Sequence, residues 1–278
     1  MSELLLDPAA WLVLFFGLAP VAFNTFVVDV QTQMLLVSAY FTLAWAAYFY
    51  IAVCRRTVNL WLGLASALFM LGVGIPIGRF LHFNVLSVFY DMTASSNLFV
   101  QWVGNVLSHG LNEEVMKALS VLLLAFPLRQ AKKPIDGIFY GALSGLGFAA
   151  WEGHKLISEA QTPALMMMTV MIRSVTNCLL HASYTGISGY FIAIGALGRR
   201  RVALPAMGIA IAILLHGSFD FRADSRDGFP LSLLLGAVTY LLFRHCVARS
   251  FEDAGDERSV TEGTSTWHGT QVLQKQPS

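Results

Sequence analysis

Charged residues are scarce in this chain. Asp, Glu, Lys and Arg make up 13% of its 278 residues, and 56% of the residues are hydrophobic. Soluble domains carry roughly a quarter of their residues as charges, so this composition cannot cover a water-facing surface of the required size. The net charge of +1 and the absence of an extended basic patch also exclude a nucleic-acid partner.

Other common signals are missing as well. The three cysteines, Cys54, Cys178 and Cys246, show no CxxC spacing, so neither a disulfide framework nor a thiolate metal site is expected. No internal repeat of the kind found in many secondary transporters is visible. The first apolar run lacks a basic segment before it and a small-residue cleavage site after it, so it is expected to be a retained helix.

Long apolar runs dominate what is present. A helix needs about 20 mostly apolar residues to span a bilayer, and these runs are too long for barrel strands. The sequence therefore predicts an all-α integral membrane protein, a polytopic bundle of about eight transmembrane helices. The expected segments are 8–28, 34–54, 59–78, 97–126, 137–156, 164–197, 202–221 and 228–247, with a break near Ser108 to Gly110 in the fourth.

The distribution of Lys and Arg predicts how the chain is oriented. Twelve of these residues fall on one face of the membrane, four on the other, and Lys117 and Arg173 lie within spans. Because basic loops stay in the cytoplasm, both termini of this multi-pass cell-membrane protein are expected to be cytoplasmic. The polar composition from Ser250 onward predicts a membrane domain over 1–249 and a disordered cytoplasmic tail over 250–278.

Ionisable residues interrupt four of the apolar segments. Such groups cost several kcal/mol in the hydrocarbon region, so they usually line a cavity or pair with one another. The first three segments carry almost none and are expected to be scaffold. The interrupting residues are Glu113, Glu114 and Lys117 in the fourth segment, Glu152 in the fifth, Arg173 and His181 in the sixth, and His216 and Asp220 in the seventh.

The spacing of these residues places them on defined helix faces. Lys117 follows Glu113 by four residues and Glu114 by three, so it can neutralise one of these carboxylates. The adjacent glutamates project about 100° apart and can face different partners. His216 and Asp220 are one helical turn apart, which suits a carboxylate that orients an imidazole through its second nitrogen.

A polar stripe also runs along the sixth segment, where Arg173, Asn177 and His181 repeat every four residues. Taken singly, each feature has a structural explanation, because an intramembrane histidine or a Glu–Lys pair often only joins helices. Gly141-xxx-Gly145 likewise predicts close helix packing and no chemistry. Together, three glutamates, two histidines and an aspartate on four successive segments are too costly for structure alone and predict an active site.

In order along the chain, these residues resemble the PrsW family of intramembrane proteases, which is grouped with the type II CAAX prenyl proteases. The family pattern is EExxK, FxxxE, a histidine and HxxxD. The matching residues are Glu113-Glu114-x-x-Lys117, Phe148-x-x-x-Glu152, His181 and His216-x-x-x-Asp220, all within a motif-bearing core over 97–221. One departure is Gly153, which follows Glu152 where the family often has Asn.

The resemblance implies an enzyme that hydrolyses peptide bonds of membrane-embedded or membrane-anchored proteins in the lipid bilayer. Glu113 or Glu114, assisted by Glu152, is expected to activate water, because burial makes a carboxylate more basic. The implied catalytic set is Glu113, Glu114, Glu152, His181, His216 and Asp220, and the implied supporting residues are Lys117, Phe148, Arg173 and Asn177.

The role of the histidines is open at this stage. With Glu152, His181 and His216 offer a set of ligands for a divalent metal such as zinc. Alternatively, the two histidines donate hydrogen bonds to the oxyanion of the tetrahedral intermediate and no metal takes part. The HExxH zinc motif is absent.

Two other functions are compatible with a polar cluster inside a membrane protein. A proton- or ion-coupled transporter uses similar chains of acids and histidines, although the missing repeat argues against it. A non-catalytic membrane scaffold would retain the fold and bind a partner helix, although the complete Glu, His and Asp set argues against lost catalysis. The sequence identifies neither the substrate nor the oligomeric state.

Overall fold

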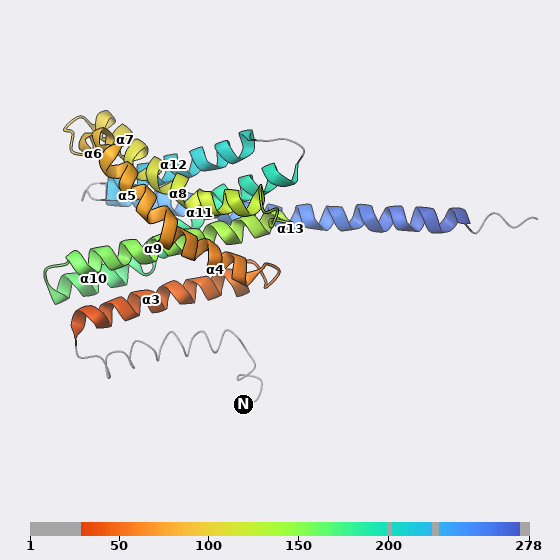
Figure 1. The fold of residues 1–278 in the computed structure, drawn as a ribbon, viewed down its shortest axis with the longest axis horizontal. Helices are drawn as coiled ribbons and strands as arrows, with labels where there is room; N and C mark the ends of the chain where they lie inside the picture. Colours follow the sequence, from red (N-terminus) through yellow and green to blue (C-terminus); the bar gives the residue numbers. More distant parts are fainter. Residues whose placement is uncertain (1–28, 199–201, 224–227, 273–278) are drawn as a thin grey trace, which may run out of the picture.

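A computed structural model describes residues 29–198, 202–223 and 228–272, and within these ranges every regular element is a helix (Figure 1). The predicted all-α class is confirmed for this part of the chain. Of three short π-helical turns, η1 extends the end of α3, η2 joins α4 to α5, and η3 joins α7 to α8. The elements are α3 (Val30–Tyr48), η1 (Phe49–Val53), α4 (Leu60–Phe69), η2 (Met70–Gly74), α5 (Ile75–Asn84), α6 (Ser87–Met92), α7 (Leu98–Asn105), η3 (Val106–Gly110), α8 (Leu111–Ala125), α9 (Pro134–Glu159), α10 (Pro163–Arg173), α11 (Thr176–Leu197), α12 (Ala203–Ala223) and α13 (Phe229–Val272).

Five helical stretches in the described ranges are long and apolar enough to cross a membrane: Val30–Val53, Leu60–Asn84, Pro163–Leu197, Ala203–Arg222 and Pro230–Glu252. A membrane protein is therefore confirmed, while the count of eight spans stays a prediction. The first predicted segment, 8–28, lies outside the described residues. Two further predicted segments, 97–126 and 137–156, are not among these five stretches. They contain α8 and α9, the helices that carry the glutamates.

The fourth and sixth predicted segments both contain local distortions. In the fourth a break was predicted, and in the sixth it was not. Near Ser108 the helix is not interrupted but forms the π-helical turn η3. A Cβ atom on Gly110 would lie 2.5 Å from the carbonyl oxygen of Ile213, so the backbones of η3 and α12 are almost in contact. The predicted sixth segment consists of two helices, α10 and α11, separated by Ser174 and Val175.

The centre of the bundle is the pair formed by α9 and α11, which pack backbone against backbone. Gly137, Gly141 and Gly145 follow one face of α9 at four-residue intervals. A Cβ atom on each would collide with a carbonyl oxygen of α11, and for Gly145 that oxygen belongs to His181. The predicted packing role of Gly141 and Gly145 is confirmed. The close contact at Gly145 also fixes the position of His181 along the axis of α9.

A side chain at Gly145 is expected to disturb both stability and the site. We expect Gly145→Ala to lower the free energy of unfolding by about 1–3 kcal/mol, the usual cost of overpacking, and to shift His181. Thermal unfolding in detergent would measure the effect. Gly72→Ala is the matched control, because a Cβ atom there meets nothing within 4 Å. Equal melting temperatures for the two variants would contradict this account of the packing.

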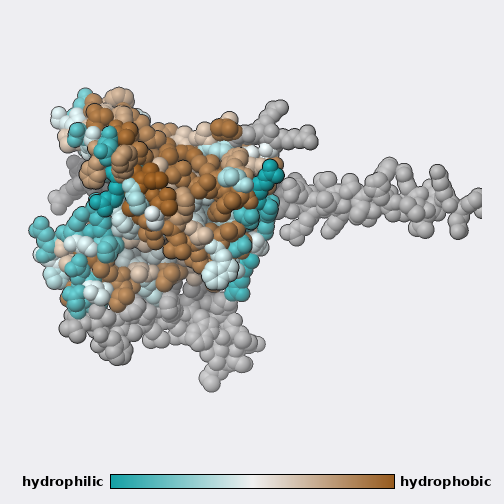
Figure 2. Space-filling model, viewed as in Figure 1, coloured by the Kyte–Doolittle hydropathy of each residue, from teal (hydrophilic) through white to brown (hydrophobic). Residues whose placement is uncertain are grey.

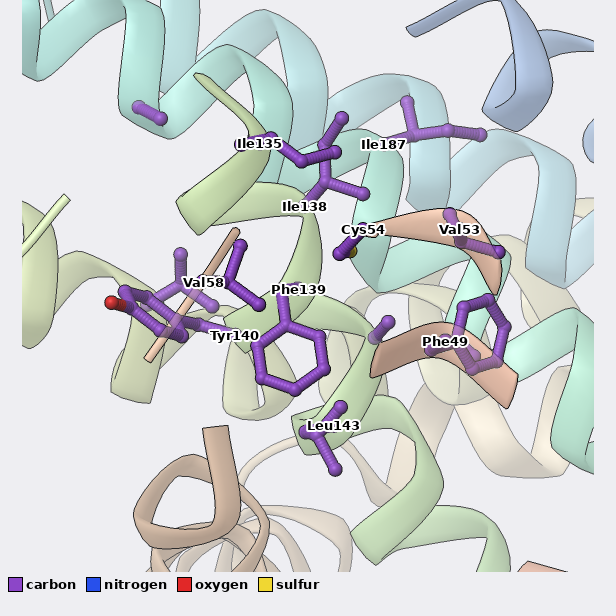
Figure 3. Packing of buried hydrophobic residues seen from close by; sticks show 14 of the residues in the cluster. Phe49, Val53, Cys54, Val58, Ile135, Ile138, Phe139, Tyr140, Leu143 and Ile187 are labelled. Atoms are coloured by element: carbon purple, nitrogen blue, oxygen red, sulfur yellow. The ribbon is translucent and has the colours of Figure 1, made fainter. Parts of the chain in front are cut away.

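Apolar side chains fill the space at one end of this helix pair (Figure 3). Phe49 and Cys54 are fully buried, and on α9 Ile138, Phe139 and Leu143 are at most 2% exposed. The ring of Phe139 lies so close to Gly63 on α4 that no side chain fits there. This core holds the scaffold helices α3 and α4 against α9.

The outer surface of the bundle is apolar in its middle (Figure 2). Hydrophobic residues gather across the face shown, and hydrophilic ones lie toward its two sides. Large apolar side chains on several helices are exposed, including Trp61 at 77%, Phe80 at 61% and Leu241 at 67%. Exposed apolar surface on this scale is what a lipid-facing bundle requires.

Basic loops that the sequence assigned to one face lie together at one end of the bundle. The Nζ atom of Lys133 donates a hydrogen bond to the carbonyl oxygen of Thr57, at 2.6 Å. The guanidinium of Arg55 lies 4.7 Å from the centre of the Phe251 ring. The loop before α4, the loop before α9 and part of α13 therefore share one end. Arg199, Arg200 and Arg201 lie outside the described residues, and the division into a membrane domain and a tail stays a prediction.

Gln130 offers a test of the predicted orientation. It is exposed in the loop that contains Arg129, Lys132 and Lys133. The three native cysteines are buried, so they give little background labelling. We expect Gln130→Cys to resist a membrane-impermeant thiol reagent in intact cells and to react after permeabilisation. Labelling of this cysteine in intact cells would show that the loop lies outside the cell and would contradict the predicted orientation.

Candidate active site

The ionisable residues of four helices meet in the interior of the bundle. α8 contributes Glu113, Glu114 and Lys117, α9 contributes Glu152, α11 contributes His181, and α12 contributes His216 and Asp220. All are joined by contacts of 3.7 Å or less. The side chains of Glu114 and Lys117 have no exposed surface. Residues up to 107 positions apart in the sequence therefore form one cluster, Glu113 to Asp220.

Glu114 is the structural carboxylate of this cluster. Its Oε1 atom accepts hydrogen bonds from Lys117 Nζ at 2.6 Å and from His216 Nδ1 at 2.8 Å. Its Oε2 atom accepts one from the hydroxyl of Thr185, at 3.3 Å. Both oxygens are occupied and closed to water, so Glu114 ties α8 to α11 and α12.

Lys117 is held on all sides by the same cluster. Besides Glu114, its ammonium lies 3.5 Å from Glu113 Oε2 and 2.9 Å from His181 Nδ1. It also lies 4.5 Å from the centre of the Phe148 ring, which adds a cation–π contact. Because an ammonium can only donate, Nδ1 of His181 accepts this hydrogen bond.

His181 is oriented through both of its ring nitrogens. With Nδ1 facing Lys117, the Nε2–H group donates to Glu152 Oε2 at 3.0 Å. Glu152 in turn lies 3.7 Å from the guanidinium of Arg173, whose Nη1 donates to Asn177 Oδ1 at 3.4 Å. The polar stripe of the sixth segment therefore serves to position Glu152 and His181.

His216 is surrounded by carboxylates. Its Nδ1–H group donates to Glu114, while Nε2 lies 3.3 Å from Asp220 Oδ2 and 3.7 Å from Glu113 Oε2. The ring stacks on Tyr184, with centroids 4.9 Å apart and an interplanar angle of 17°. A nitrogen that faces two carboxylate oxygens needs a cation between them, either its own proton or a metal ion.

Glu113 reaches water, as do Glu152 and Asp220, whose side chains are 24% and 29% exposed, whereas Glu114 does not. Glu113 lines a cleft of about 670 Å³ together with Glu152, His109 and Trp151. The side chain is 13% exposed, against 0% for Glu114. Its Oε2 atom is buried and has no hydrogen-bond partner, whereas Oε1 lies 3.7 Å from His109 Nδ1. The two adjacent glutamates thus face different surroundings, as their 100° separation requires.

A candidate metal-binding group is present in the cluster, and its carboxylate is not the one that the sequence suggested. Among the described residues, Glu113, His181 and His216 offer ligand atoms within 4.8 Å of one another. The sequence suggested Glu152 as the carboxylate of this set, but Glu152 contacts His181 from the far side, beside Arg173. Glu113 is the carboxylate of the candidate group, and its Oε2 atom lies 3.7 Å from His216 Nε2.

The charges of the cluster also favour a divalent cation. Glu113, Glu114, Glu152 and Asp220 are four carboxylates, and the permanent cations in contact with them are Lys117 and Arg173. With neutral histidines two negative charges remain uncompensated in a buried site. The unpartnered Glu113 oxygen and this imbalance together show that the residues fit a divalent ion.

Some residues of the site were not identified from the sequence. His109 is one of them: it lies one helical turn before Glu113 and contacts it. That spacing was a usable signal. Tyr184 and Thr185 carried less of a signal: Thr185 lies four residues after His181 and extends its polar stripe, whereas nothing in the sequence marks Tyr184 as the partner of His216.

The family of the chain is shown by comparison with known proteins. A family model described as "PrsW family intramembrane metalloprotease" matches residues 59–244, which include every residue of the cluster. The chain belongs to the PrsW family. Membership confirms the predicted resemblance and the predicted enzyme class, a membrane protease, and the family description supports a metal without identifying it.

Curated relatives agree with this assignment. "Protease PrsW" of Clostridioides difficile (strain 630) is 32% identical over 178 residues, 62% of this chain and 72% of that protein. "Protease PrsW" of Shouchella clausii (strain KSM-K16) is 30% identical over 137 residues, 49% of this chain and 61% of that protein. The match thus spans less than two thirds of the Shouchella relative. No solved structure gives a significant match.

Proposed function

We propose that this PrsW-family chain hydrolyses peptide bonds of membrane-embedded or membrane-anchored proteins at the cleft beside Glu113. One observation carries the proposal. Glu113 is the carboxylate that both lines the cleft and keeps a buried oxygen without a hydrogen-bond partner. His181 and His216, on α11 and α12, each offer a ring nitrogen within 4.8 Å of a Glu113 oxygen. Hydrolysis needs this combination of a water-facing base and fixed polar groups.

Each residue of the cluster then has a defined task. Glu113, His181 and His216 would hold the metal, which supplies a water of lowered pKa and polarises the scissile carbonyl. His181 would bind it through Nδ1 only after Lys117 gives up its hydrogen bond to that nitrogen. Glu113 accepts the proton of the attacking water on Oε1, the oxygen nearer His109, and passes it to the leaving amine. Glu152 keeps His181 oriented, and Glu114 and Asp220 do the same for His216. The ligand types, two imidazoles and a carboxylate, suit zinc.

A cleavage screen tests this proposal. The purified chain is incubated in detergent with model substrates that contain one Leu/Ala membrane helix followed by a randomised juxtamembrane segment, and the products are read by mass spectrometry. We expect the wild type and Glu159→Gln to cleave the same substrates and Glu113→Gln to cleave none. Glu159 is an exposed α9 residue outside the cleft, which makes it the matched control. Equal cleavage by all three proteins would overturn the assignment of Glu113.

A further inference from the structure

Two cations without acidic partners lie in the same cleft as Glu113. Arg79 in the middle of α5 and Lys155 near the end of α9 both line the cleft, and both are exposed. Among the ion pairs of the described residues, none involves either of them. They approach the cleft from two different helices, which argues against a chance orientation of one flexible side chain.

These cations form no ion pair with the acids of the active site. Glu152 already contacts Arg173 and His181, and Glu113 already contacts Lys117. The other acidic residues close in sequence, Asp91 and Glu159, do not line the cleft. His82 and His109, which do line it, add no negative charge. The part of the cleft next to Arg79 and Lys155 therefore keeps an excess of positive charge.

The remainder of the cleft is apolar. Met70, Ile75, Met116, Phe148 and Trp151 line it from η2, α5, α8 and α9. An apolar wall, two free cations and a water-facing carboxylate in one cleft match an extended segment with apolar side chains and one acidic side chain near the cleaved bond.

We infer that Arg79 and Lys155 form a subsite that selects substrates with an Asp or Glu next to the scissile bond. The inference rests on the proposed function and names the substrate class of that site. Lipid phosphate is the other anion that cations of a membrane protein commonly meet. The peptide is favoured because both residues share their cleft with Glu113 and Glu152, where the cleaved bond has to lie.

The test uses substrates that differ in one charge. From a cleaved model substrate, versions with Glu, Gln or Lys at each juxtamembrane position are prepared, and kcat/KM is measured in neutral detergent. We expect the wild type to prefer Glu to Gln by about fivefold for each cation engaged, the upper range for exposed ion pairs. Arg79→Gln/Lys155→Gln is expected to bring the ratio of the Glu and Gln rates to about one, and Arg79→Glu/Lys155→Glu is expected to prefer the Lys substrate.

Controls separate the possible outcomes. Lys132→Gln, an exposed residue in the loop before α9, should keep the wild-type preference. An unchanged preference in Arg79→Gln/Lys155→Gln overturns the inference. So does a loss of rate for every substrate that appears in phosphatidylglycerol vesicles and not in phosphatidylcholine vesicles, because it assigns the two cations to lipid. If the wild type cleaves no model substrate, the proposed function fails, whereas cleavage without charge preference rejects the subsite alone.

Discussion

Glu113→Gln and Glu114→Gln should fail in different ways, although the two residues are adjacent. Glu113 lines the cleft and has a free oxygen, so we expect its amide to lower the rate of cleavage by about 10²–10⁴-fold or more and to leave the melting temperature nearly unchanged. Glu114 has no exposed surface and binds Lys117, His216 and Thr185. Its amide leaves a buried ammonium poorly compensated, at a cost of about 3–5 kcal/mol of stability.

Two measurements separate these effects. Turnover of a cleaved model substrate reports on the chemistry. Reaction of the buried cysteines Cys54, Cys178 and Cys246 with a thiol-sensitive dye during heating reports on unfolding. A Glu114→Gln variant that is as stable as the wild type, or a Glu113→Gln variant that is strongly destabilised, would reverse the assigned roles.

The histidine variants are expected to have the second large effect. If Glu113, His181 and His216 share a metal, His181→Ala and His216→Ala each remove one of three ligands. We expect both to lose bound metal and turnover together, because a site with two ligands left rarely retains its ion. Elemental analysis of the purified variants, alongside the turnover assay, measures both quantities.

Chelation distinguishes this mechanism from one without metal. If the histidines only stabilise the oxyanion, each alanine variant should cost about 10²–10³-fold in rate, and chelators should have no effect. Wild-type protein that contains no divalent metal and turns over normally in chelator would reject the metal. Asp91→Asn, a change outside the cleft, is the control that should alter neither metal content nor rate.

Much of the site could be predicted from the sequence, because charged residues in apolar helices are costly and therefore conspicuous. The spacing of Glu114 and Lys117, and of His216 and Asp220, correctly indicated pairs that the structure contains. Gly141 and Gly145 indicated the close contact of α9 with α11. These are local patterns, fixed by the geometry of one helix.

What the sequence could not supply depends on how helices are rotated against one another. Periodicity shows that Glu113 and Glu114 face different ways, but which one meets the cleft is decided by the contact of η3 with α12 at Gly110. The same limit applies to the candidate metal-binding group. The sequence suggested Glu152 as its carboxylate, yet only packing reveals that Glu113 faces His216 and that Glu152 lies behind His181.

The helices that carry the glutamates are a further case in which composition alone is not sufficient. The helices that carry the glutamates, α8 and α9, are not among the stretches apolar enough to be identified as spans. Their polar residues face other helices: Glu114 and Lys117 are fully buried, and Ser144 on α9 donates a hydrogen bond to the carbonyl of Lys117 at 2.8 Å. A helix enclosed by its neighbours tolerates charge that a lipid-facing helix does not.

The account depends most on water being activated at Glu113 to break a peptide bond. Cleavage of a model substrate in water enriched in oxygen-18 tests this directly, because the attacking oxygen stays in the new carboxyl group. We predict that mass spectrometry finds one labelled oxygen at the new C-terminus with the wild-type protein and no such product with Glu113→Gln. A product without label, or a labelled product formed equally well by Glu113→Gln, would contradict the proposal.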